Sequence, residues 1–579
     1  MQKIPASCGL ETGFAQTGQT THSGDNSAPQ PEHARFSNSI SSTSYSTPIP
    51  SAYANEEEKH RGTKGSQENI EGFVVGIISY EREWTETNMS FRKLLFVLIA
   101  FPLAVLLPAQ QPFSRSHWIA ENSAKFWFSE SVLASNTLED TPPPATFALP
   151  ASAPAEVQIS HDIFQATTAQ PETESEPTIA INPRRSANLV AGYQEARFAN
   201  GGAEVLGFAY SFDHGAHWKE GIVPDLTIGA GGSIQRASDP WLAFGPHNDV
   251  YFASIAFNET DPLSGIYINV SENGGKRFKS PVAVIETSAI HQFNDKVSVV
   301  TDTSNASPGF GNVYVCWDQE DGNQVKVLVA RSTDHGNSFG TPAVLQSTGR
   351  PSIGIIALVD SHGNLFAIWL SLQGRGAGQI LLSRSSDAGI TWTEPAAIAR
   401  VQENGVKRLR TGGLPATAID KRSGAIYVVW PDSRFTKTAD QIAMTMSTDG
   451  GSTWSAPKRI SDGPPNKANF TPAVAVNSHG EVAVSYYSLR NDPRGNNLVD
   501  ELIQISTVGG QTFLPAVQMS SHSFDVRFAA RARRFFLGDY QGLAAASRSF
   551  HPVWVATMNA SQINPSRKQP DVFTTRYRN

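Results

Sequence analysis

The stretch STDGGSTW at residues 447–454 decides the fold of this chain, because variants of it recur about every 60 residues. The other copies are SFDHGAHW from Ser211, SENGGKRF from Ser271, STDHGNSF from Ser332, SSDAGITW from Ser385 and STVGGQTF from Ser506. In the shared pattern Ser-x-Asp-x-Gly-x-x-Trp/Phe, we expect Asp to accept hydrogen bonds from its own turn, while Gly supplies an unusual backbone conformation. The Trp or Phe ring at the end of the pattern is expected to anchor the turn on a sheet. Such a near-constant period predicts stacked copies of one supersecondary unit.

Seven short apolar segments open the repeating units, and their composition is typical of β-strands. Each leads to a second strand such as VYVCWDQ, a third such as QIAMTMS and a fourth such as SAPKRIS. The seventh unit has three such strands, and PAEVQIS at residues 154–160 matches the fourth strands of the other units. We therefore expect this N-terminal segment to complete the last unit. The seven segments begin at Glu176, Asp239, Asp295, Pro351, Leu414, Thr471 and Asp539.

The turn pattern resembles the Asp box, or BNR repeat, of the sialidase-like superfamily, which implies an all-β fold and a β-propeller. We expect seven four-stranded blades over residues 154–579, closed by the N-terminal strand. A six-bladed ring with an irregular extra sheet is the alternative. In that superfamily the box is a structural turn remote from the active site. Val508 replaces Asp in the sixth copy, and a structural role tolerates one weakened copy.

Composition and charge exclude several classes of function. The chain has 579 residues, 40% of them hydrophobic, and a formal net charge of -7. That length is sufficient for one large β domain, and the absence of a basic excess argues against nucleic acid as a partner. Its two cysteines, Cys8 and Cys316, form neither a disulfide framework nor a CxxC metal site.

The N-terminal quarter of the sequence carries targeting and linker signals. Residues 1–88 are polar and are expected to be disordered, or an over-extended reading frame whose true start is Met89. Residues 89–110 have the charged start and the short apolar run of a signal peptide, with a type II membrane anchor as the alternative. Residues 111–153 include a Pro/Ala-rich stretch typical of an extended linker. We therefore expect a secreted or periplasmic protein, with membrane contact only if the apolar segment stays uncleaved.

Charged and aromatic side chains gather on one predicted face of the ring. Strands within a blade alternate in direction, so first strands begin where second strands end, opposite the Asp-box turns. We call this side the opening face. Carboxylates for acid and base catalysis are expected from Glu176, Asp239, Asp295 and Asp539. Residues expected to bind a ligand are Arg236, Arg350, Arg410, Trp317, Trp430, Asp432, Arg434 and Tyr540. The structural alternative is that these side chains cap loops or pair between blades.

The resemblance to sialidases fails at the residue that best diagnoses their activity. An Arg-Ile-Pro motif opens the first sialidase blade, whereas this chain has Ser175-Glu176-Pro177. We therefore expect a non-sialidase that binds an extracellular glycan or glycoconjugate on the opening face. The alternatives are an exo-sialidase-like glycoside hydrolase and a protein-interaction scaffold. We expect a monomer without a resident cofactor or metal; Ca²⁺ bound by the opening-face acids is the alternative.

Overall fold

The computed structural model describes residues 112–122, 155–374, 376–493 and 497–578. The chain divides into two compact units, Met1–Leu103 and Ala104–Asn579, and every described residue belongs to the second. The predicted extension and signal peptide lie outside the described residues. The predicted linker differs from expectation in one respect, because residues Arg115–Asn122 form helix α1. Within the described ranges, no helix has both the length and the apolar character needed to cross a membrane.

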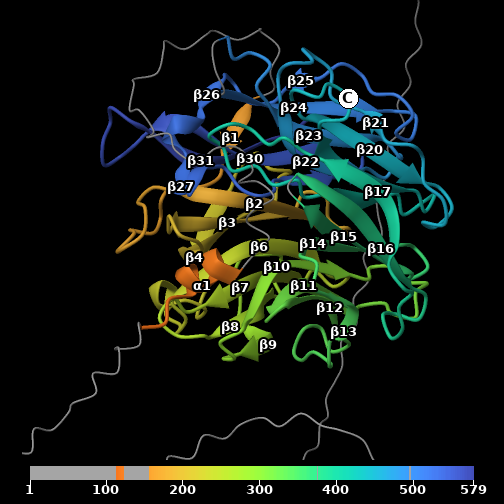
Figure 1. Ribbon diagram of the computed structural model, residues 1–579, viewed down its shortest axis with the longest axis horizontal. Coiled ribbons are helices and arrows are strands. Elements are labelled where there is room, and N and C mark those ends of the chain that lie inside the picture. The colour runs from red at the N-terminus through yellow and green to blue at the C-terminus, as the bar shows by residue number, and fades with distance from the viewer. Residues whose placement is uncertain (1–111, 123–154, 375, 494–496, 579) are drawn as a thin grey trace, which may run out of the picture. The chain divides into compact units, whose positions relative to one another are not determined.

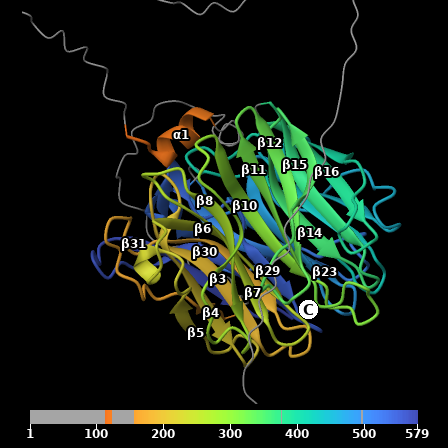
Figure 2. The same cartoon turned by 90° about the horizontal axis from the view of Figure 1, so that it is seen from below.

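The second unit is built almost entirely of antiparallel β-sheets, most of them with four strands that follow one another along the chain (Figures 1 and 2). The first sheet holds two such groups joined by the Ala203–Ala237 pair. Its strands are β2 (Glu174–Ile181), β3 (Leu189–Arg197), β4 (Ala203–Ser211), β5 (Lys219–Ile222), β6 (Arg236–Phe244), β7 (Val250–Phe257), β8 (Ser264–Ser271) and β9 (Val282–Thr287). The next two sheets contain β10 (Gln292–Thr301), β11 (Val313–Asp321), β12 (Gln324–Ser332) and β13 (Ala343–Thr348), then β14 (Ser352–Val359), β15 (Leu365–Gly374), β16 (Ala377–Ser385) and β17 (Ala396–Gln402).

Three further sheets complete the set. One contains β18 (Ala416–Ile419), β19 (Ile426–Asp432), β20 (Gln441–Ser447) and β21 (Lys458–Arg459). The next contains β22 (Asn469–Val476), β23 (Val482–Ser488), β24 (Leu498–Ser506) and β25 (Val517–Gln518), with β26 (Phe524–Asp525) also paired to β24. The last contains β29 (Gly542–Ala545), β30 (Phe550–Ala560), β31 (Lys568–Thr575) and β1 (Glu156–Gln158). A hairpin of β27 (Ala530–Ala532) and β28 (Arg534–Phe536) precedes it, and two 3-10 turns, η2 (Ile228–Ala230) and η3 (Val526–Phe528), lie in connecting segments.

The N-terminal strand pairs with the last strand of the chain. Glu156 lies opposite Thr575, and Gln158 lies opposite Phe573. The first strands of the seven groups also contact one another in chain order, from β2 through β6, β10, β14, β18 and β22 to β29, and β29 contacts β2 as well. Figure 1 shows β6, β10 and β14 side by side. Each of the seven opening segments read from the sequence thus contributes a strand that borders its neighbours.

The core lies between adjacent sheets and is filled by the second strands. Strands β3, β7 and β19 are buried at every residue, because both of their faces pack against other sheets. Four second strands carry a fully buried indole each, at Trp317, Trp369, Trp430 and Trp554. Burying rings of this size supplies a large share of the hydrophobic free energy of such a domain.

A bulge interrupts five of the first strands at an equivalent place. Their pairing with the second strand shifts register there, and the backbone takes a positive φ of 48° to 74°. Four of these residues are not glycines, and each such conformation costs roughly 1 to 3 kcal/mol. A bulge redirects the side chain out of the ladder, and here it turns these positions toward the opening face. The five residues are Glu176, Asp239, Lys296, Gly354 and Thr471.

The repeated turns join the third strand of a group to the fourth and dock onto the preceding group. In the third turn the Ser332 hydroxyl donates to Asp334 Oδ1 at 2.7 Å and accepts from the Gly336 amide at 2.8 Å. Gly336 has a φ of +79°, and a Cβ there would lie 3.0 Å from the ring of Tyr251 in the preceding sheet. In the sixth turn the Gly510 amide still donates to Ser506 Oγ at 2.9 Å, although Val508 has replaced the acid. The serine and the second glycine therefore keep the turn's shape without Asp.

Candidate functional site

A cavity of about 100 Å³ lies on the opening face, where the first-strand bulges of the early groups converge. All four carboxylates predicted as acid and base candidates line it, although they come from two different sheets and a loop. Its polar lining is Glu176, Asp239, Asp295, Asp539, Arg197, Arg410, Arg533 and Lys296, together with Ser238 and Asn200. Its apolar lining includes Ile119, Ile255, Phe257, Phe293, Ile353, Leu370 and Leu414. Four acidic and four basic side chains therefore meet in one pocket.

Glu176 and Asp239 occupy equivalent bulges in neighbouring groups and share a hydroxyl. The Ser238 hydroxyl lies 2.7 Å from Asp239 Oδ1 and 3.5 Å from Glu176 Oε2, while the amide of Gln194 donates to Glu176 Oε2. Burial, with a smaller repulsion from Asp239, raises the pKa of Glu176 from 4.5 to about 8, although Arg197 opposes the shift. Burial also raises the pKa of Asp239, against the attraction of Lys296. At neutral pH the pair thus holds a protonated Glu176 next to a second carboxyl.

Lys296 takes the third bulge and sits among aromatic rings. Its ammonium lies 3.5 Å from the centre of the Tyr540 ring, 4.9 Å from that of Trp241, and 3.8 Å from Asp239 Oδ2. The Tyr540 hydroxyl donates to the carbonyl of Pro240 at 2.9 Å. Burial raises the pKa of Tyr540 well above its usual value, and the nearby carboxylates add to the shift. Tyr540 is therefore a cation-binding ring whose hydroxyl is fixed by a carbonyl.

Three arginines supply the positive side of the cavity. Arg410 makes a two-pronged ion pair with Asp539, through Nε at 3.1 Å and through Nη2. Burial lowers the pKa of Arg410, but the carboxylates of Asp539 and Glu176 outweigh it and raise the value. The guanidinium of Arg197 lies 4.3 Å from the centre of the Phe536 ring, and that of Arg410 lies 4.7 Å from it. Arg533 forms the tip of the β27–β28 hairpin, with a φ of 64°. The cavity can accept an anionic or a densely hydroxylated ligand.

Helix α1, labelled in Figure 2, contributes Ile119 to the lining of the cavity. The buried Arg115 fixes this helix, because its guanidinium donates to the carbonyls of Pro262 at 2.5 Å and Gln292 at 3.1 Å. Glu259 accepts hydrogen bonds from the hydroxyls of Ser114 and Ser116, both at 2.6 Å. A segment expected to be linker is therefore a built part of the site.

Several residues predicted to bind a ligand have structural roles instead. Trp317 and Trp430 were expected to bind a ligand, but both are fully buried, and their indole nitrogens donate to Asn294 and Asp432. Asp432 also accepts two hydrogen bonds of 2.8 Å from the guanidinium of Arg434 and one of 2.9 Å from its backbone amide. Asp432 and Arg434 therefore cap their own loop, as the structural alternative predicted.

The two remaining predicted arginines lie outside the cavity lining. Arg236 is buried, and its guanidinium donates to Asn200 Oδ1 at 2.8 Å and to the Gly201 carbonyl at 2.9 Å. It therefore supports a loop that borders the cavity. Arg350 is exposed on the surface. Of the eight residues predicted to bind, Arg410 lines this cavity, and Tyr540 lines a smaller one beside it together with Lys296 and Asp539.

Arg197, Lys296 and Arg533 line the cavity but were not among the site residues predicted from the sequence. Arg197 ends a second strand on the opening face, which is a signal visible in the sequence. The sequence pattern aligns Asp295 with Glu176 and Asp239. In the structure the bulge of β10 falls one residue later, so Lys296 takes the place equivalent to Glu176 and Asp239. Arg533 lies in an arginine-rich loop whose hairpin geometry sequence patterns do not reveal.

Comparisons with known proteins give structural matches only. No family model matches the chain, and no curated protein matches it. A protein of unknown function from Dyadobacter fermentans is 14% identical over 59% of this chain and 94% of its own, with a TM-score of 0.40. The Trypanosoma rangeli sialidase is 15% identical over 62% of this chain and 60% of its own, with a TM-score of 0.39. A Penicillium chrysogenum α-L-arabinanase is 10% identical over 58% of this chain and 93% of its own, with a TM-score of 0.40. Similarity at this level identifies neither a family nor an activity.

Proposed function

We propose that the chain is a seven-bladed β-propeller of the Asp-box type, closed where β1 completes the last blade. The cyclic contacts of the seven first strands support this arrangement, since β29 borders both β22 and β2. The β1–β31 pairing supports the closure, because it removes a sheet edge that would otherwise stay open. A six-bladed ring would leave one group outside this cycle of contacts.

We infer that the opening-face cavity binds a glycan and hydrolyses a glycosidic bond. The observation that carries this is the pair formed by Glu176, whose pKa of about 8 keeps it protonated at neutral pH, and Asp239. Glycoside hydrolases use two carboxyl groups, one to protonate the leaving oxygen and one to act as a base or nucleophile. The arginines and Lys296 would hold the substrate's hydroxyls or carboxylate.

The carboxyl groups of Glu176 and Asp239 carry out the hydrolysis. Glu176 donates its proton to the glycosidic oxygen as the bond to the anomeric carbon breaks. Asp239, once ionised, either accepts a proton from an attacking water or bonds to the anomeric carbon, and the separation of the two carboxyls decides between these routes. In the first route Asp239 keeps the proton of the water, and exchange with solvent then restores both carboxyls. In the second route a water displaces Asp239 from the anomeric carbon and gives a proton to Glu176, which restores both carboxyls. An exo-sialidase mechanism with a tyrosine nucleophile is less well supported, because Tyr540 is fixed to the Pro240 carbonyl and is resistant to ionisation.

A glycan-binding function without turnover is the second candidate, and one observation favours it. Asp539 is already paired with Arg410, and Asp239 lies near Lys296, so much of the carboxylate charge is neutralised inside the protein. A binding protein of this kind would keep its affinity for glycan but release no product. We place either function outside the cytoplasm, because residues 89–110 carry the pattern of a signal peptide.

Hydrolysis of aryl glycosides tests the proposal. The panel contains neutral and acidic sugars, including a sialoside and an α-L-arabinofuranoside, and calorimetry with the corresponding free glycans runs beside it. Turnover that is lost in Glu176→Gln but kept in Arg350→Ala supports a hydrolase. Binding without product, lost in Arg410→Ala, supports the second candidate. Absence of both turnover and binding across the panel contradicts both candidates and favours a protein-interaction scaffold.

A further inference from the structure

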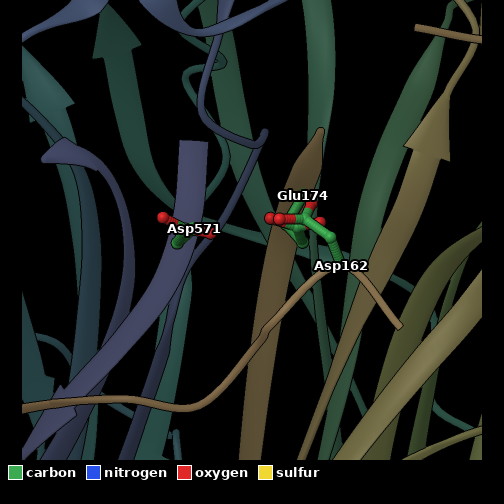
Figure 3. A group of neighbouring side chains, drawn as sticks. All are labelled: Asp162, Glu174 and Asp571. Carbon is green, nitrogen blue, oxygen red and sulfur yellow. The ribbon is translucent and has the colours of Figure 1, made fainter. Parts of the chain in front are cut away.

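Three carboxylates meet where the N-terminal segment joins the end of the chain. Asp162 lies in the segment after β1, Glu174 begins β2, and Asp571 lies in β31 (Figure 3). One oxygen from each lies within 4.8 Å of the others. None of the carboxylates that line the opening-face cavity belongs to this group, so it is a separate feature.

Glu174 is the least compensated member of this group. It is fully buried, and neither of its carboxylate oxygens accepts a hydrogen bond from a neighbouring amide, hydroxyl or basic group. Burial raises its pKa well above the usual value, and the charges of Asp162, Asp571 and Glu195 add to the shift. An isolated buried carboxylate is costly unless it is neutralised or coordinates a cation.

Neighbouring amides hold the other two acids in place. The side-chain amide of Gln569 donates to Asp162 Oδ2 at 2.6 Å and to Asp571 Oδ1 at 3.0 Å, and that of Asn559 donates to Asp571 Oδ2 at 2.8 Å. The amide oxygen of Gln569 is itself buried and has no hydrogen-bond donor. Gln569 thus turns its N–H donors toward the two aspartates, whereas Glu174 receives no such donor.

His161 compensates the negative charge of these acids only weakly. His161 lowers the pKa of both Asp162 and Asp571, but it ranks behind burial in each case. Its ring is more than half exposed and is paired with Glu220 at 3.0 Å. The negative charge of the group therefore has little compensation from this side chain.

We propose that Asp162, Glu174 and Asp571 bind a Ca²⁺ ion that fastens the two ends of the domain together. Ca²⁺ takes six to eight oxygen ligands at about 2.3 to 2.6 Å, so two ligands on opposite sides of the ion are about 5 Å apart. The 4.8 Å span of the carboxylate oxygens fits this size. The ion would link β2 and the segment before it to β31. Water supplies the remaining ligands.

A shared proton between Asp162 and Glu174 is the competing arrangement. It would relieve the same repulsion without a cation, so stability would depend on pH and not on Ca²⁺. The two arrangements are distinguished by adding CaCl₂ at constant pH to full-length protein that has been dialysed against EDTA.

Isothermal titration with CaCl₂ and thermal unfolding test the site. We expect binding of one Ca²⁺ and a rise in the Tm of a few degrees, because an ion that binds the folded state alone stabilises it by mass action. Glu174→Gln and Asp571→Asn should weaken Ca²⁺ binding by more than about tenfold, since the affinity of such sites follows the number of charged ligands.

The matched control is Glu403→Gln. Glu403 is also buried with both oxygens lacking a hydrogen-bond donor, but it lies outside the three-carboxylate group, so its variant should keep the wild-type response to Ca²⁺. Two results overturn the proposal. One is a wild-type protein whose heat of titration and Tm are unaffected by CaCl₂, and the other is Glu174→Gln protein that binds Ca²⁺ as tightly as the wild type does.

Discussion

Replacing Glu176 by Gln should stabilise the folded protein at neutral pH, and the gain should grow with pH. In the fold the pKa of this carboxyl is about 8, against an ordinary value of 4.5. Between these values the folded state holds a proton that the unfolded state has lost, so the wild-type free energy of unfolding falls as pH rises. The slope from this one group is about 1.4 kcal/mol per pH unit. From about pH 5 to about pH 7 the accumulated loss is roughly 2 to 3 kcal/mol.

Glutamine cannot ionise, and its side-chain oxygen can still accept the hydrogen bond from Gln194, so the variant should lose this slope. Urea unfolding of both proteins at several pH values from about 5 to about 8.5 measures the difference. The exposed Glu272→Gln, at a residue paired on the surface with Lys279, serves as the control and should parallel the wild type. A stability difference between Glu176→Gln and wild type that is the same at every pH would refute the reasoning, because it would mean that Glu176 is ionised in the folded state throughout.

Three further changes probe the turns, the arginines and helix α1. Gly336→Ala forces a side chain into a φ of +79° and against the Tyr251 ring, so it should lower the free energy of unfolding by about 1 to 3 kcal/mol; an unchanged Tm would contradict the docking of this turn. Arg410→Ala removes the partner of Asp539 and should weaken glycan binding by more than about tenfold, whereas Arg350→Ala should not; calorimetry with equal losses for both would contradict this. Arg115→Ala removes two hydrogen bonds that hold helix α1, so chymotrypsin should cut this segment faster than in the wild type; equal cutting rates would show that the helix is held by other contacts.

The repeats made most of the strand layout predictable from the sequence. Turn residues at fixed offsets and short apolar segments are local signals, and each of the seven opening segments contributes a strand. The N-terminal segment could be matched to its place because its residues repeat the fourth-strand pattern, and it pairs with β31. What the sequence could not show was the bulge, because register is set by pairing with the second strand. That is why Asp295, and not Lys296, was aligned with Glu176.

The candidate site was predictable in its acids and less so in its arginines and aromatics. Glu176 and Asp239 each precede a proline at the start of a strand, which is a visible repeat. Trp317 and Trp430 lie within the second strands β11 and β19, and the packing of adjacent sheets buries both rings. The group of Asp162, Glu174 and Asp571 has no sequence signature, since its last member is some four hundred residues from the first.

The pairing of β1 with β31 has a consequence for how this protein is made. Residues 568–575 are synthesised about four hundred residues after residues 156–158, so β1 stays without its partner while the intervening sheets are made. The domain therefore cannot complete its final sheet on a partly made chain. A chain that stops before β31 leaves β1 without its partner, and an unpaired strand edge of this kind can pair with other chains and aggregate.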